Sequence, residues 1–166
     1  MKKISILAFV AGIFLFVACG GGSKEVTLSD KGKMICDNQW KLQINETIKG
    51  TTDSIKDTTG ITANIELKGD VGKIADFFAE TIVFAVDGSD KSKLSYKRTI
   101  GEGLLSSSVV GFWEFNADET AIIMKEWDAT AGAEKAPETY KIQELTADKL
   151  VLLKDGASSP NIYAKK

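Results

Sequence analysis

Apolar and polar residues alternate along several short segments of this chain, and the clearest example lies between residues 111 and 153. Residues 111–115 alternate, residues 116–119 have the composition of a turn, and a second β-rich segment follows. If Phe115 pairs with Thr120, one face of the hairpin carries the apolar side chains of Trp113, Phe115, Ile122 and Met124. This face is predicted to belong to a core.

Residues 140–153 repeat this hairpin design. One strand ends at Leu145, the polar corner 146–149 follows, and Leu150 begins the returning strand. Strict pairing of Leu145 with Leu150 would place Tyr140 and Ile142 on the opposite face from Leu145. The sequence therefore predicts a β-bulge near residues 143–144.

Further strands are predicted on both sides of these hairpins. They cover residues 40–45, 61–68, 81–86, 93–100 and 161–164. The segment 61–68 shows the cleanest alternation in the chain. In the segment 93–100, Arg98 shares a face with Leu94, Tyr96 and Ile100, so Arg98 is expected to point inward or toward a rim of the sheet.

Two short helices are expected beside the strands. Ser29 is a candidate N-cap for a helix over residues 30–36, with Met34 and Ile35 facing inward. Cys36 is interpreted as a small buried residue, because no neighbour would activate its thiol. Within residues 70–79, Ile74, Phe77 and Phe78 lie at helical spacing, and this helix is expected to plug one end of a barrel.

These segments predict an all-β fold. About eight strands follow one another with mostly short connections, and no strand–helix unit repeats. Closure of such a sheet removes its exposed edges, which favours an up-and-down antiparallel β-barrel. A chain of 166 residues has room for one ordinary core, so a single domain is expected over residues 29–166.

Composition argues against several classes of function. The chain has no histidine, the usual general base near neutral pH and the commonest metal ligand. It has no Gly-x-Ser-x-Gly elbow and no phosphate loop, so neither catalysis nor a cofactor is expected. Glu114 and Glu126 are interpreted as solvent-facing charges, and Asp53 and Asp57 lack the spacing of a calcium loop. The net charge of −2 and the lack of a basic stripe argue against nucleic acid.

The first nineteen residues have the pattern of an export signal. Lys2 and Lys3 precede an apolar run over residues 4–18 that is too short to span a bilayer comfortably. The segment Phe16-Val17-Ala18-Cys19 resembles the lipobox of bacterial lipoproteins, although phenylalanine stands where leucine is preferred. The resemblance implies removal of residues 1–18 and lipidation of Cys19 by acyl chains such as palmitate. An ordinary signal peptide or a membrane anchor is the alternative.

A lipidated Cys19 implies attachment to a bacterial membrane. Residues 19–28 would then form a glycine-rich tether between the lipid and the domain. In such lipoproteins, aspartate after the cysteine favours the inner membrane. Gly20 stands there in this chain, so the resemblance favours the outer membrane, on its periplasmic or its surface face.

Four further motifs point to a family. Asn38-Gln39-Trp40-Lys41-Leu42 is the first, and the others lie at residues 84–88, 111–118 and 140–150. Together with the lipobox they resemble the small bacterial lipocalin-like lipoproteins. Lipocalins proper have glycine at the position of Asn38, so the wider lipocalin-like group is favoured. The resemblance implies a β-barrel with a small-molecule cavity or a binding rim.

Two functions are compatible with such a barrel. The first is binding of a small, partly apolar ligand, for which the candidate lining residues are Trp40, Tyr96, Arg98, Trp113, Phe115 and Tyr140. An inward Arg98 can meet a carboxylate or phosphate. The alternatives are a core filled by these aromatic residues and an ion pair between Arg98 and a glutamate at the barrel end.

The second function is an interaction or inhibitor module of the cell envelope. Polar loops at residues 51–60, 101–107 and 129–136 are long enough to contact a partner protein. A filled barrel with an exposed apolar patch at these loops would favour this function over ligand binding.

Overall fold

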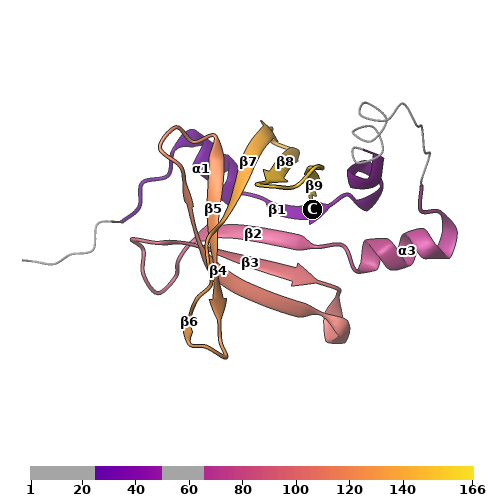
Figure 1. The fold of residues 1–166 in the computed structure, drawn as a ribbon, viewed down its shortest axis with the longest axis horizontal. Helices are drawn as coiled ribbons and strands as arrows, with labels where there is room; N and C mark the ends of the chain where they lie inside the picture. Colours follow the sequence, from indigo (N-terminus) through magenta and orange to yellow (C-terminus); the bar gives the residue numbers. More distant parts are fainter. Residues whose placement is uncertain (1–24, 50–65) are drawn as a thin grey trace, which may run out of the picture.

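The computed structural model describes residues 25–49 and 66–166 (Figure 1). Its elements are α1 (Asp30–Cys36), β1 (Gln39–Leu42), α3 (Gly69–Phe77), β2 (Thr81–Val86), β3 (Leu94–Ile100), η1 (Gly103–Leu105), β4 (Ser107–Phe115), β5 (Ala121–Asp128), β6 (Ala133–Glu134), β7 (Glu138–Leu145), β8 (Lys149–Lys154) and β9 (Asn161–Lys165). Residues 44–49 are also helical. The expected signal, Cys19, the loop 51–60 and residues 61–65 of an expected strand lie outside the described residues.

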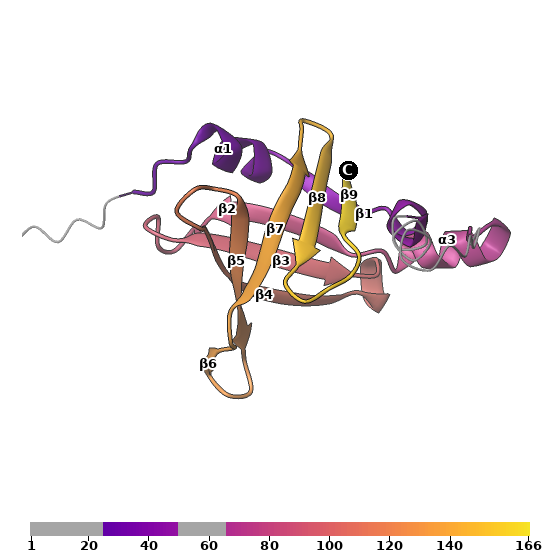
Figure 2. The same cartoon turned by 45° about the horizontal axis from the view of Figure 1, so that its top comes forward.

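Eight of these strands form a closed antiparallel barrel (Figures 1 and 2). From β1 to β5 each strand pairs with the next, and the order continues through β7, β8 and β9. The barrel closes where β9 returns to β1, with Tyr163 opposite Leu42. The all-β, up-and-down barrel predicted from the alternation is confirmed. The two-residue strand β6 lies beyond it, paired with the end of β5.

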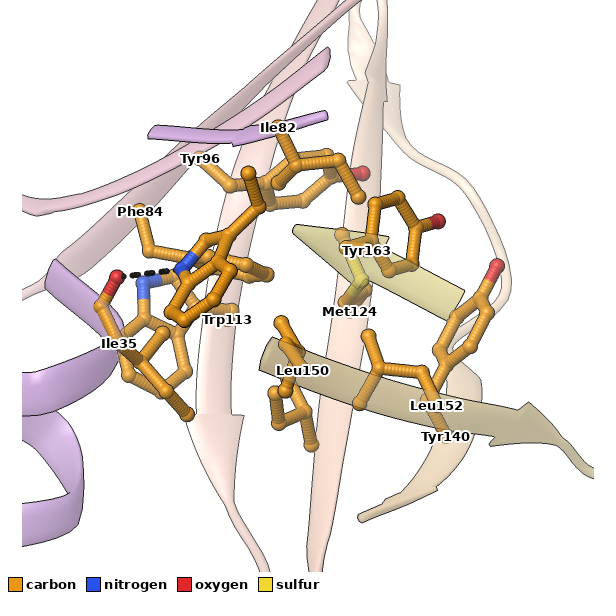
Figure 3. Packing of buried hydrophobic residues seen from close by; sticks show 12 residues of the cluster. Ile35, Ile82, Phe84, Tyr96, Trp113, Met124, Tyr140, Leu150, Leu152 and Tyr163 are labelled. Carbon is orange, nitrogen blue, oxygen red and sulfur yellow. Dashed lines mark hydrogen bonds between the residues drawn. The ribbon is translucent and has the colours of Figure 1, made fainter. Parts of the chain in front are cut away.

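Side chains fill the interior of the barrel (Figure 3). The buried cluster contains Ile35, Trp40, Ile82, Phe84, Tyr96, Trp113, Ile122, Met124, Tyr140, Leu150, Leu152 and Tyr163. The Trp113 ring meets those of Phe84 and Phe115 edge to face, at centroid distances of 5.3 and 5.2 Å. These aromatic contacts add to the stabilisation from apolar burial.

Helix α1 covers one end of this core. The Ser29 hydroxyl accepts a hydrogen bond of 3.1 Å from the backbone nitrogen of Gly32, so the predicted N-cap is confirmed. Ile35 is fully buried, and its carbonyl oxygen accepts a hydrogen bond of 2.9 Å from Nε1 of Trp40. Met34 is only half-buried, and Cys36 is half-buried against the cluster.

Helix α3 forms where the sequence predicts a helix, but it does not plug the barrel. It extends away from the barrel (Figures 1 and 2), and none of its residues is buried. Ile74 and Phe78 are exposed, at 59% and 48% of their surfaces. The predicted plug is therefore wrong, because helical spacing shows which residues share a face and not which element covers them.

The hairpins test the predicted register. Between β7 and β8 the register shifts between Ile142 and Glu144, and Leu145 lies opposite Leu150, so the predicted bulge is confirmed. Between β4 and β5, Phe115 lies opposite Ile122, and the predicted pairing of Phe115 with Thr120 is wrong.

The side chain of Asn116 explains this difference. Its Oδ1 accepts hydrogen bonds from the backbone nitrogens of Thr120 and Ala121, which widens the turn. The shift is two residues, so the apolar face predicted for the hairpin stays the same. The first predicted strand is also shorter than expected, because β1 ends at Leu42 and a helix begins at residue 44.

Candidate functional site

Arg98 lies at the end of the core that is remote from α1. Its guanidinium donates a hydrogen bond of 3.0 Å to Oε2 of Glu126 and lies 5.9 Å from the centroid of the Tyr96 ring. Lys135 also binds the Glu126 carboxylate. The ion pair of Arg98 with a nearby glutamate, one of the two alternatives from the sequence, is therefore present.

The two glutamates interpreted as solvent-facing differ. The Glu126 side chain keeps only 19% of its surface exposed, so that interpretation is wrong for Glu126. The hydrogen bond from Lys135 lowers the pKa of Glu126, and Arg98 lowers it further against the effect of burial. Glu114 is exposed and pairs with Lys125 at 3.2 Å.

Three buried tyrosines lie on the same side of the core, opposite Ile35 (Figure 3). Tyr140 donates a hydrogen bond of 2.7 Å to Glu138, and Tyr163 donates one of 2.8 Å to Glu80. Burial raises the pKa of Tyr96 to about 12 and raises the pKa values of Tyr140 and Tyr163 above their usual range. The Tyr96 hydroxyl has no hydrogen-bond partner in the described part of the chain.

The structure brings together only some of the six residues expected to line a ligand cavity. Tyr96, Arg98 and Tyr140 lie at one end of the barrel, whereas Trp40 contacts α1 at the other and Phe115 packs beside Trp113. Arg98 lines none of the three best-formed hollows among the described residues. Of the six residues, Trp113 is the one that lines any of these three hollows. Its Nε1 is buried and has no hydrogen-bond partner among residues 25–49 and 66–166.

Phe112 lies on the outer wall of the barrel between two of these hollows. One measures about 320 Å³ and is also lined by Lys93, Leu94, Ile123 and Lys125. The Lys93 ammonium lies 5.3 Å from the centroid of the Phe112 ring. The second hollow measures about 460 Å³ and is also lined by Val110 and Trp127.

The second hollow lies beside the end of the β4–β5 pairing. The two strands separate beyond that point (Figures 1 and 2). Their pairing ends at Gly111 opposite Glu126. Residues 107–110 of β4 pair with β3 only, while Trp127 and Asp128 of β5 pair with β6. We call residues 107–110 and 127–128 the split. The split is not predicted from the sequence, although Val110 and Trp127 are apolar residues at outward positions, with 52% and 42% of their surfaces exposed.

The loop before β4 carries further exposed apolar side chains. Leu104 is fully exposed, and Leu105 is 70% exposed. The base of the loop is held in place, because Glu102 pairs with Lys41 at 3.9 Å and with Lys166 at 3.7 Å. We call Leu104 and Leu105 the leucine tip.

Gly101 gives this loop a fixed shape. Its φ is +81°, and a Cβ at this position would lie 2.4 Å from the carbonyl oxygen of Leu105. The leucine tip is thus presented by a close-packed turn of the backbone.

The chain matches no protein-family model, no curated protein and no solved structure. Within residues 25–49 and 66–166, no helix has the length and apolar character needed to cross a membrane. The same residues contain no group of acidic or cysteine side chains that could hold a metal ion.

Proposed function

We propose that this protein is a lipid-anchored module of the cell envelope that binds a partner protein through the outer surface of a lipocalin-like barrel. The observation that supports this is the contrast between a filled interior and large apolar side chains left in water. Leu104 and Leu105 directly precede β4, Val110 lies on β4, and Val110 lines the same hollow as Trp127. Clustered apolar exposure of this kind is typical of a binding surface.

The attachment point of the tether supports a partner away from the anchoring membrane. The backbone nitrogen of Val26 donates a hydrogen bond of 2.8 Å to the carbonyl oxygen of Lys91, and Glu25 pairs with the Lys91 ammonium at 2.8 Å. Lys91 precedes the start of β3, whereas the leucine tip follows its end. A strand of seven residues spans roughly 20 Å, so the tether and the leucine tip lie at opposite ends of β3.

Chemical cross-linking in intact cells tests the interaction. The variant Leu104→Ser/Leu105→Ser should lose the cross-linked complex formed by the unmodified protein, while its thermal unfolding stays unchanged because both side chains lie in water. The matched control is Val71→Ser/Ile74→Ser, which replaces two other exposed apolar residues, on α3. Retention of the complex by the leucine variant would contradict the proposal.

Metabolic labelling tests the anchor separately. We expect labelled palmitate on the unmodified protein and none on Cys19→Ala, because only the cysteine of the lipobox is acylated. Cys36→Ala is the matched control and should be labelled normally. Labelling of Cys19→Ala would show that the lipid is carried elsewhere.

Binding of a small anion at the end of the barrel near Arg98 is a second candidate function. The Arg98 side chain keeps 21% of its surface exposed, and the neighbouring Tyr96 hydroxyl is unpaired within the described residues. Native mass spectrometry of the purified protein should then detect a bound small acid that Arg98→Met does not retain. Identical spectra for the two proteins would argue against this function.

A further inference from the structure

The edge of β4 within the split has backbone groups that the barrel does not use. Neighbouring residues of an antiparallel strand direct their N–H and C=O groups alternately to the two sides. Residues 107–110 pair with β3 on one side and with no strand on the other. Within the described chain their backbone groups bond to no element besides β3. Two of these four residues therefore direct both groups outward.

We propose that this edge binds an extended segment of the partner protein as an additional strand. The inference rests on the proposed function and specifies how the partner is held. Addition of a strand to a free edge supplies main-chain hydrogen bonds, and hollows beside the edge select the side chains.

The walls of the split indicate the chemistry of the segment. Val110, Phe112 and Trp127 line the hollow of about 460 Å³ beside the edge, which suits a large apolar side chain on the outward face of an added strand. Lys97 lies opposite Val110 on β3 and forms no ion pair among the described residues. An acidic side chain on the same outward face would lie within reach of the Lys97 ammonium.

The shape of the split favours a segment of another protein over a second copy of this chain. The free edge is four residues long, with the leucine tip before it and the junction at Gly111 after it. The ribbon formed by β5 and β6 projects from the barrel on the other side (Figures 1 and 2). A single extended chain fits between the leucine tip and the β5–β6 ribbon. A second copy of the barrel would bring its own leucine tip and its own ribbon against those of the first.

Fluorescence titration of the full chain in detergent with a synthetic peptide tests the proposal. The probe is acetyl-Ser-Val-Thr-Leu-Thr-Glu-Ser-amide, which places its apolar residues and its glutamate on one face. Trp127 is exposed while Trp40 and Trp113 are buried, so a blue shift of the emission reports burial of Trp127. We expect a saturable blue shift and about tenfold slower amide exchange at two of residues 107–110.

Modified peptides and variants separate strand addition from general adhesion. Two peptides are N-methylated on alternate residues, one at the odd positions and the other at the even positions. One of the two should fail to bind, because the amides of one set must face β4. Exchange protection at residues 107–110 should weaken about tenfold in Trp127→Ser and remain in Val71→Ser, since Val71 lies on α3. Equal binding by both methylated peptides, or no protection of residues 107–110, overturns the proposal.

Three further results are decisive. Protection of residues 107–110 that increases with protein concentration in the absence of peptide would identify a second copy as the occupant and overturn the proposal. If the peptide fails while the Leu104→Ser/Leu105→Ser variant still loses its cross-linked complex, strand addition is wrong and the proposed function stands. If the peptide binds but no cross-linked complex depends on the leucine tip, strand addition at β4 stands and the proposed function is wrong.

Discussion

The indole Nε1 of Trp40 donates a 2.9 Å hydrogen bond to the backbone carbonyl oxygen of Ile35, which joins the first strand to the helix that covers the barrel end. Both residues are fully buried. A single side chain thus fixes the position of α1 and contributes its ring to the core.

Replacement of Trp40 by phenylalanine should destabilise the protein by about 1–3 kcal/mol, because the buried carbonyl oxygen of Ile35 loses its donor. The phenylalanine ring is also smaller than the tryptophan ring, and the space it leaves in the core adds to the loss of stability. Unfolding in urea measures the change. The matched control is Trp127→Phe, whose exposed ring should change stability by less than about 0.5 kcal/mol. Equal effects of the two substitutions would contradict the role given to the hydrogen bond.

Gly111 should not tolerate alanine. A Cβ at this position would lie 2.2 Å from the carbonyl oxygen of Lys125 and 2.8 Å from Cε1 of Tyr96. The strands must move apart to accept it, and we expect a loss of about 3 kcal/mol or more in the free energy of unfolding. Gly88→Ala is the control, because its Cβ would meet no atom within 4 Å. A stable Gly111→Ala protein would show that β4 and β5 are less closely apposed than described.

The sequence predicts the strands well because alternation and turn composition are local properties. The bulge beside Glu144 is predicted correctly because two apolar faces had to be reconciled within one hairpin. The strand pairing across the turn after Phe115 is predicted wrongly. The composition of residues 116–119 does not reveal that the Asn116 side chain accepts hydrogen bonds from two backbone nitrogens beyond the turn.

The predictions that fail concern contacts between distant elements. Apolar spacing in α3 does not show that the helix extends away from the barrel, and Arg98 on an apolar face does not identify Glu126 as its partner. The split is missed for the same reason. Whether β5 stays beside β4 or leaves it depends on β6, which local alternation does not predict.

The tyrosines should ionise only at strongly alkaline pH in the folded protein. The chain has three, and burial raises the pKa of each, that of Tyr96 to about 12. Because the folded state keeps the phenols protonated, their contribution to stability is complete below about pH 10 and decreases as the pH rises further. Ultraviolet titration should show no tyrosinate at pH 10.5 in the native protein and more than half ionisation in denaturant. Normal titration of the native protein would contradict this burial.

Cys36 should react slowly. Burial, and then the charge of Asp37, raises its pKa from 9.0 to about 11, so at pH 8 the thiolate population is lower by about 100-fold. Alkylation by iodoacetamide should slow by a similar factor relative to the unfolded chain. The Cys19→Ala variant isolates this signal, since the chain has two cysteines. Equal rates in the two states would show that the thiol is accessible.

The pairing of β9 with β1 has a consequence for biogenesis. Trp40 and Lys165 face each other across the seam, so the two margins of the cylinder come from opposite ends of the sequence. During synthesis β1 is made first, and it has no neighbour on that side until β9 has also been made. The barrel can therefore close only after the last strand has been made, and a chain truncated before β9 would leave the backbone groups on that side of β1 unpaired.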